Sequence, residues 1–407
     1  MPVITLFSGS YCDATAVTQE IGARTGYRLV SDEEIVAEAS RLSNIPQNRI
    51  ERVFADKTSV FNRLTRERER SLAYLRASLA QRLREEGLLF CGFAAQMIPR
   101  TIRHALRVCL IADMNSRVAA AGRALGIDAD EALKTIHRED EKCAAWIHVL
   151  HGVRDPWDAS LYDLCLPTDK TSREEIAALV EKSIAAAVIK LASGSRQAVE
   201  DFNIAADVEI ALVKKGHTVG VDVREGIVTL TINKHVMRLG HLEAELKAIA
   251  VGAAGVKAVE TKVGPGYYQT DVYRRQDFEA PSKILLVDDE KKYVQTLSQR
   301  LMMRELDSAV VYDGASALEL AQDDEPDVMI LDLRMPDIDG IEVLKRVKQT
   351  RPAIEVIVLT GQGSEEDRRT CMELGAFAFL SKGGGIDELS RTIQAAREKI
   401  RKARAAD

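Results

Sequence analysis

The chain has 407 residues, of which 46% are hydrophobic and 29% charged, and its formal net charge is −6. This length allows two to four domains, each with its own core. The acidic balance excludes a chain that binds nucleic acid over its whole surface. No apolar run reaches the roughly 18 residues of a transmembrane helix, and the N-terminus lacks the basic start of a signal peptide. The six scattered cysteines form no CxxC pair, so we expect a reducing, cytoplasmic compartment.

Residues 1–195 alternate segments typical of strands with segments typical of helices. The apolar segments predict strands at Val3–Ser8, Leu88–Phe93, Arg107–Ala112 and Leu161–Pro167. The long charged segments between them predict helices at Asn62–Glu86, Ser116–Leu125 and Ala129–Leu150. Alternation of this kind is typical of a parallel α/β sheet.

Residues 200–265 have a different pattern, which predicts a small α+β domain in αββαβ order. The expected elements are a helix, two alternating strands, a second helix and a third strand, at Ala205–Lys215, His217–Val223, Gly226–Ile232, Leu239–Val251 and Val256–Val263. Residues 266–282 are polar and predict a linker. Residues 283–400 return to alternating strands and helices.

Four apolar strands of this last segment each end in polar residues. The predicted strands are Lys283–Val287, Val328–Leu331, Val356–Leu359 and Ala376–Leu380, and the residues that follow them include Asp288, Asp289, Asp332, Thr360 and Lys382. In a doubly wound sheet the carboxyl ends of the strands form the ligand-binding edge. A carboxylate such as Asp332 is a nucleophile for a phosphoryl group. Grouped carboxylates repel unless a hard cation, most simply Mg²⁺, lies among them.

The motifs VDDE, DLRMPDIDG, LTG and FLSKG resemble the receiver family of two-component response regulators, over residues 283–400. The resemblance implies a doubly wound (βα)5 fold and a histidine kinase or phosphotransfer protein as partner. It implies that Asp332 accepts the phosphoryl group and that Lys382 and Thr360 contact its oxygens. The Mg²⁺ ligands carried over are Asp288, Asp289, Asp332 and the backbone carbonyl of Arg334.

Two further features of this segment follow from the same resemblance. Thr360 and Phe379 match the family's switch pair, in which the hydroxyl moves toward the phosphoryl group and the ring turns inward. The family usually has proline after the lysine, whereas this chain has Gly383-Gly384-Gly385. We expect these glycines to loosen the loop and to remodel the output face.

The first strand ends in Ser8-Gly9-Ser10, which suggests a phosphate-binding loop. The pattern GxxxxGK[ST] nevertheless fails at every position after Gly9, and Asp13 would repel a phosphate. Gly9 and Ser10 are retained as weak candidates for nucleotide contacts.

Residues 1–192 nonetheless resemble the cytidylate kinase-like family, in ITLFSGSY, GARTGY, LLFCGFAA and the stretch from Arg117 through Arg138 to Leu164. The resemblance implies a P-loop-kinase-like parallel α/β fold. The family's basic Gly-rich loop and a second arginine are replaced here by Asp13–Ala16 and Phe93. Arg117, Arg123 and Arg138 match lid arginines, although solvated surface arginines explain them equally. We predict a kinase fold without kinase activity, which binds an unidentified nucleotide or serves as an interaction platform.

Residues 200–265 resemble a BON domain, in Asp207–Ile210, in Glu225-Gly226 between the strands, and in Gly255–Val259. Such domains are associated with membrane or ligand binding. No catalytic constellation is visible in the segment, which favours a binding or spacer module.

Three functions remain open from the sequence. The first is a response regulator that signals through N-terminal domains that do not bind DNA, since no helix-turn-helix segment is evident. The second is a receiver-gated nucleoside monophosphate kinase of cytidylate kinase type. The third is a scaffold whose receiver only drains phosphate from a kinase. The output partner stays unnamed and a homodimer stays open.

Overall fold

The computed structural model describes residues 2–404 apart from 55–66, 186–192, 234–235, 237, 266, 268–282, 303, 305, 307, 337 and 362. The chain divides into two compact units, one holding the first two sheets and the other holding the C-terminal sheet. Most of the predicted linker over 266–282 lies outside the described residues. Tyr267 is described, and it is buried in the core of the middle module, so it is not part of a solvated linker.

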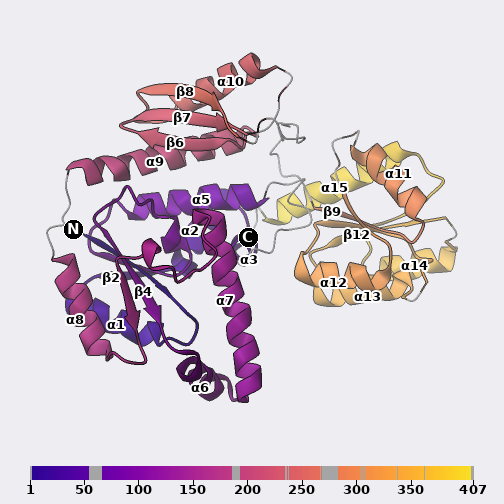
Figure 1. Cartoon of the computed structure of the whole chain (residues 1–407). Coiled ribbons are helices and arrows are strands. Elements are labelled where there is room, and N and C mark those ends of the chain that lie inside the picture. The colour runs from indigo at the N-terminus through magenta and orange to yellow at the C-terminus, as the bar shows by residue number, and fades with distance from the viewer. Residues whose placement is uncertain are drawn as a thin grey trace. The chain divides into compact units, whose positions relative to one another are not determined.

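The N-terminal sheet has five parallel strands in the order β2-β3-β1-β4-β5, of which Figure 1 labels β2 and β4. Their bounds are β1 Val3–Ser8, β2 Arg28–Ser31, β3 Leu88–Cys91, β4 Ala105–Ile111 and β5 Leu164–Pro167. The central strand β1 is buried along almost its whole length, as its run of apolar residues predicts. The predicted parallel sheet is confirmed, and the sequence analysis missed β2.

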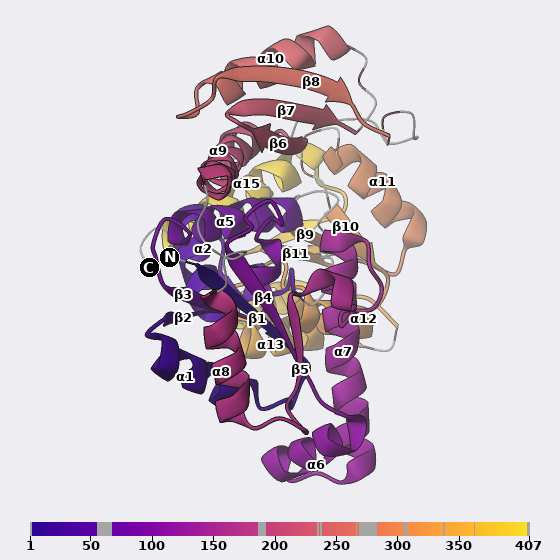
Figure 2. The ribbon, with the colours of Figure 1, turned by 60° about the vertical axis from the view of Figure 1, so that its left-hand side comes forward.

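Helices cover both faces of this sheet. On one face α1 (Ala14–Thr25) and α8 (Arg173–Ile184) lie side by side, as Figure 2 shows, and bury Val17, Ile21 and Val180 against the strands. The other face is covered by α2 (Asp32–Ser43), α5 (Glu67–Arg82) and α7 (Ala129–His151). The remaining elements are α3 (Gln47–Glu51), α6 (Met114–Leu125) and 3-10 turns at Ala94–Met97 and Ala159–Leu161.

The middle module has the predicted αββαβ order. It consists of α9 (Ser193–Lys214), β6 (Gly220–Arg224), β7 (Ile227–Ile232), α10 (Leu239–Val251) and β8 (Ala258–Val263). Strands β6 and β7 pair antiparallel, whereas β7 and β8 pair parallel. Glu225 and Gly226 both have positive φ at the tight turn, which is the geometry that suits a two-residue hairpin.

Helix α9 begins at Ser193, well before the predicted start at Ala205. Its N-terminal part is held by the first sheet's domain, where Ser195 Oγ hydrogen-bonds the His104 ring. One side of the helix packs Phe202 and Ala206 into the N-terminal core, and another packs Val208 into the middle module. The predicted boundary at 195–200 therefore falls inside a continuous helix that both cores share.

The C-terminal unit is a second parallel sheet, in the order β10-β9-β11-β12-β13. Its strands are β9 Ile284–Val287, β10 Ser308–Val311, β11 Val328–Leu331, β12 Glu355–Thr360 and β13 Ala378–Ser381. Its helices are α11 Lys291–Met302, α12 Gly314–Asp323, α13 Gly340–Thr350, α14 Glu365–Glu373 and α15 Ile386–Arg404. This order is that of a doubly wound (βα)5 domain, as predicted.

Candidate functional site

Three carboxylates meet at the carboxyl edge of the C-terminal sheet. Asp288 and Asp289 follow β9 and Asp332 follows β11, and one ligand oxygen from each lies within 4.8 Å of the others. Asp288 and Asp332 are only 5% and 4% exposed. Oxygen ligands at this spacing fit a hard divalent cation such as Mg²⁺. This is the one such group of potential metal ligands in the part of the chain that the structure describes.

Lys382 faces these carboxylates from the end of β13. Its Nζ donates to Asp332 Oδ2, Asp288 Oδ2 and Glu290 Oε1, each at 2.8 Å. The same ammonium lies 4.8 Å from the centre of the Tyr293 ring. The sequence analysis named Lys382 but gave no role to Glu290 or Tyr293, and only the acidic run after β9 could have suggested Glu290.

The ionisation of these groups follows from their crowding. Burial raises the pKa of Asp288, and the hydrogen bond from Lys382 only partly opposes this effect. Burial alone would lower the pKa of Lys382, but its hydrogen bonds to Asp288, Asp332 and Glu290 raise it above its usual range. Lys382 therefore stays protonated. The carboxylates of the cluster outnumber this one ammonium, so the cluster can bind further positive charge.

The loop after β11 presents one oxygen of Asp332. Asp332 Oδ1 accepts the backbone N–H of Leu333 at 2.7 Å, which leaves Oδ2 facing Lys382. Gly340 lies against this loop so closely that a Cβ there would be 2.1 Å from the carbonyl oxygen of Asp332. A glycine is therefore needed at position 340 to hold the loop, a requirement that the sequence analysis did not identify.

The predicted switch pair lies beside this pocket. Thr360 ends β12 and is buried, and Phe379 lies on the adjacent strand β13. Gly363 lies between them, because a Cβ at that position would be 2.5 Å from Phe379 Cζ and 2.8 Å from Thr360 Cγ2. Both side chains therefore lie close to Gly363, and their role as a switch pair stays a prediction.

Two further features named in the sequence analysis are Arg334 and the loop Gly383-Gly384-Gly385. The Arg334 guanidinium lies 3.5 Å from Asp367, and the role of its backbone carbonyl as a metal ligand stays a prediction. The glycines form a turn in which the Gly384 N–H donates to the Ser381 carbonyl at 2.9 Å. This turn borders a cavity of about 450 Å³ with Tyr293 and Leu389.

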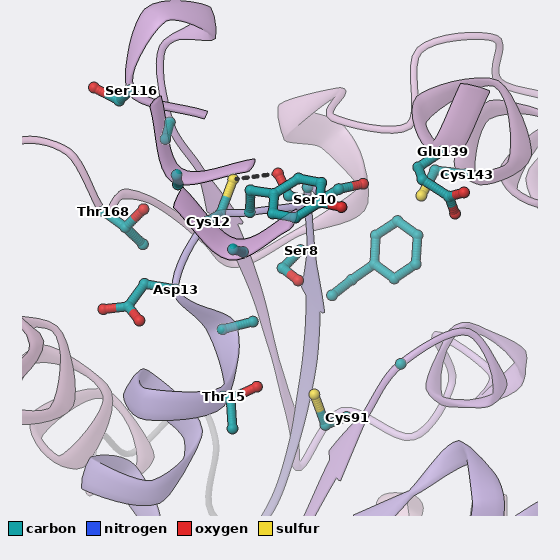
Figure 3. A pocket seen from close by; sticks show the side chains of 18 of the residues that line it. Ser8, Ser10, Cys12, Asp13, Thr15, Cys91, Ser116, Glu139, Cys143 and Thr168 are labelled. Carbon is teal, nitrogen blue, oxygen red and sulfur yellow. Dashed lines mark hydrogen bonds between the residues drawn. The ribbon is translucent and has the colours of Figure 1, made fainter. Parts of the chain in front are cut away.

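A larger cavity, about 780 Å³, lies at the carboxyl edge of the N-terminal sheet (Figure 3). Gly9 and Ser10 line it, together with Arg123. Asp13 stands at the N-terminus of α1 with φ 55°, and its carboxylate pairs with Arg173. The chain's own carboxylate thus lies at the helix end where a phosphate would bind.

The three candidate lid arginines have different environments. Arg117 is buried, donates to both oxygens of Asp140 at 2.6 and 2.9 Å, and donates to the Ser10 carbonyl at 2.9 Å. It is neither a surface arginine nor available to a phosphate. Arg138 is 68% exposed and does not line the cavity, so Arg123 alone of the three does.

Two families match this chain. The response regulator receiver domain family matches residues 284–394, and the cytidylate kinase-like family matches residues 3–170. The chain therefore carries a receiver domain at its C-terminus and a cytidylate kinase-like domain at its N-terminus, which confirms two of the three predicted resemblances. The BON resemblance of residues 200–265 stays a prediction.

Individual relatives match the receiver region. The transcriptional regulatory protein CpxR of Escherichia coli (strain K12) is 42% identical over 114 residues, 28% of this chain and 48% of that protein. The alkaline phosphatase synthesis transcriptional regulatory protein PhoP of Bacillus subtilis (strain 168) is 34% identical over 113 residues, 28% of this chain and 47% of that protein. The chain thus spans about half the length of these curated relatives.

Solved structures of receiver domains are also similar. The Francisella response regulator 1452 receiver domain is 30% identical, with a TM-score of 0.28 over 29% of this chain and 98% of that chain. A CheY-like response regulator receiver domain protein from Methanospirillum hungatei JF-1 is 23% identical, with a TM-score of 0.29 over 30% and 98%. Among the described residues, no helix combines the length and hydropathy that a membrane span requires.

Proposed function

We propose that this chain is a response regulator in which Asp332 accepts a phosphoryl group from a histidine kinase or a phosphotransfer protein. The observation that carries the proposal is the contact of Lys382 Nζ with Asp332 and Asp288, each at 2.8 Å, beside a third carboxylate. This arrangement combines a nucleophile, a fixed cation and oxygen ligands for a metal at one sheet edge.

The geometry supports a direct transfer. Asp332 Oδ2 attacks the phosphorus of a phosphohistidine, the P–N bond breaks, and the released imidazole takes up a proton. The Leu333 N–H keeps Oδ1 occupied, so Oδ2 is the oxygen presented to the donor. Lys382 then moves from the carboxylates to an oxygen of the new acyl phosphate. Bound Mg²⁺, held by Asp288, Asp289 and Asp332, would supply charge neutralisation at the phosphoryl oxygens.

The switch pair would change conformation in response to the acyl phosphate. Thr360 would donate its hydroxyl to a phosphoryl oxygen, and Phe379 would turn into the space that the threonine leaves. The position of Gly363 supports this coupling, because both side chains lie close to the same glycine. The middle and N-terminal modules would pass the signal to a partner other than DNA. The free thiols favour the reducing cytoplasm as the compartment.

The proposal is tested by treating the full chain with acetyl phosphate and Mg²⁺ and measuring the intact mass. We expect one phosphoryl increment that is stable in acid, labile in base, and absent from Asp332→Asn. Asp339→Asn is the matched control, because Asp339 lies in the same loop and asparagine also caps a helix well. An unmodified wild-type chain, or an equally modified Asp332→Asn chain, would refute the assignment.

The match to the cytidylate kinase-like family over residues 3–170 favours a second candidate, a nucleoside monophosphate kinase gated by the receiver. The pairing of Asp13 with Arg173 and of Arg117 with Asp140 argues against it. A phosphotransfer assay with ATP and CMP decides between them. We expect no turnover, and turnover that is lost in Arg123→Ala would reverse our preference.

A scaffold that only drains phosphate is separated from a switch by partner capture. A switch binds its output partner with different affinity when the full chain carries beryllofluoride, an acyl-phosphate mimic. A phosphate sink shows the same partner affinity with and without the mimic.

A further inference from the structure

The cavity of the N-terminal unit lies where a kinase of this fold would bind phosphates, yet its lining is rich in carboxylates. Asp13, Asp32, Glu139 and Asp169 line it against two guanidinium groups, Arg123 and Arg173. One of these, Arg173, is already paired with Asp13, and Lys142, which does not line the cavity, pairs with Glu139 at 2.7 Å. Among the residues that line the cavity of about 780 Å³, carboxylates therefore outnumber guanidinium groups, and a nucleoside triphosphate would add further negative charge.

Asp169 gives an independent sign of a missing partner. Its side chain is 5% exposed, and its Oδ1 is buried without a hydrogen-bond partner. Its Oδ2 lies 3.9 Å from the Lys170 ammonium, and the carboxyl also contacts that of Asp113. A buried carboxylate oxygen without a donor is costly, so a donor supplied by a ligand would stabilise it.

The neighbouring groups respond to the same environment. Burial raises the pKa of the Cys12 thiol to about 11, with further contributions from Asp140 and Asp169. Burial also raises the pKa of Cys143 to about 12, with help from Asp140 and Glu139, and that of Asp32 to about 6. Burial, the largest cause in each case, disfavours a charge of either sign, and the smaller contributions of Asp140, Asp169 and Glu139 disfavour added negative charge in particular.

We propose that this cavity binds an elongated organic cation with ammonium groups at both ends, of the aliphatic polyamine class. Figure 3 shows Glu139 and Cys143 on one side of the loop, and Asp13 and Thr168, the neighbour of Asp169, on the other. An ammonium group at each side would meet a carboxylate. The aromatic rings of Phe7, Tyr11 and Phe93 also line the cavity and suit methylene groups and cations.

A calorimetric titration of the full chain tests this inference, with spermidine, putrescine, ATP, CMP and Mg²⁺ as separate probes in about 0.15 M salt, which screens nonspecific attraction. We expect saturable binding of spermidine and none of ATP or CMP. Asp169→Asn and Glu139→Gln should each weaken spermidine binding about tenfold or more, since each removes a charge-assisted hydrogen bond. Glu174→Gln, on the exposed side of α8, is the matched control and should bind as wild type does.

Three outcomes would overturn the inference. The first is no saturable binding of either amine. The second is equal spermidine affinity in wild type and in both charge variants. The third is saturable binding of ATP or CMP, or of Mg²⁺ in competition with spermidine, which would indicate a nucleotide or metal site. If Asp169→Asn unfolds, Glu139→Gln still decides, because Glu139 lies on a partly exposed helix surface.

Discussion

The two parallel sheets of this chain each bring acidic side chains to the carboxyl edge, but the counter-charge differs. In the C-terminal unit one lysine, Lys382, contacts Asp288 and Asp332 at once, and three carboxylates remain close enough for a cation. In the N-terminal unit two arginines near the loop each pair with one carboxylate, Arg117 with Asp140 and Arg173 with Asp13. In the function that we propose, the first edge exchanges its partners for a phosphoryl group, whereas the pairs at the second hold the fold.

The largest effect expected from this difference is the loss of the Arg117–Asp140 pair. Arg117→Ala leaves Asp140 without its bidentate partner and should destabilise the N-terminal unit by about 3 kcal/mol. Both tryptophans, Trp146 and Trp157, lie in this unit, so urea unfolding followed by tryptophan fluorescence reports on it alone.

Arg138→Ala is the matched control for this experiment. Its guanidinium is 68% exposed and lies 3.7 Å from Glu139, so its removal should change the free energy of unfolding by less than about 0.5 kcal/mol. Equal effects of the two substitutions would show that Arg117 is not the fixed structural pair that we describe.

The second effect concerns the loop of the receiver. Gly340→Ala places a Cβ 2.1 Å from the Asp332 carbonyl and 2.7 Å from Leu333 Cα, both backbone atoms that cannot move alone. We expect the receiver to lose about 2–3 kcal/mol of stability and to take up less phosphoryl group, since Asp332 is displaced. Calorimetry of the full chain measures the first and intact mass the second. Gly361→Ala, whose nearest contact would be at 3.7 Å, should be close to neutral for stability.

The sequence predicted the central strands of both sheets and one edge strand of each, β5 and β13, but missed the other edge strand of each sheet. Strands such as Val328–Leu331 are buried on both faces, so they have apolar runs that end in a polar residue. The missed strands β2 and β10 each lie at an edge of their sheet and are only partly buried, so their sequences lack that run. The early start of α9 was missed because contacts with His104 and the N-terminal core, rather than local periodicity, hold its polar first turns.

The candidate sites show the same division. The receiver residues could be predicted because each directly follows a strand, which places them at one edge whatever the loops do. The pair of Arg117 with Asp140, 23 positions apart on α6 and α7, depends on how two helices pack. The positions of Gly363 between Thr360 and Phe379, and of the partnerless Asp169 Oδ1, likewise arise only in the folded chain.

A third expected effect is that the free energy of unfolding of the N-terminal unit depends on pH. Asp32 accepts the N–H groups of Phe93 and Ala94, but burial raises its pKa from 3.8 to about 6. The folded state therefore binds the proton more tightly than the unfolded state, and this stabilisation is lost as the pH rises from about 4 through about 6.

Asp32→Asn removes the titration. The stability of wild type relative to Asp32→Asn should fall by about 2 kcal/mol across that window, measured by urea unfolding with tryptophan fluorescence. Glu174→Gln, an exposed control, should follow the wild-type pH profile. A difference between wild type and Asp32→Asn that stays constant with pH would exclude Asp32 as the titrating group.

The smallest expected effect distinguishes two roles of Lys382, which are contact with the acyl phosphate and competition with Mg²⁺ for the carboxylates. Lys382→Ala removes the ammonium that we propose to contact the acyl phosphate, so acetyl phosphate should modify Asp332 about tenfold more slowly, equivalent to ~1.4 kcal/mol. The same change should tighten Mg²⁺ binding by the unphosphorylated chain, because the ammonium no longer competes for Asp288 and Asp332. Lys345→Ala, an exposed lysine on α13, should alter neither quantity. Slower phosphorylation with weaker Mg²⁺ binding would mean that Lys382 holds the carboxylates in place for the metal, and that the exchange of partners proposed for this edge does not occur.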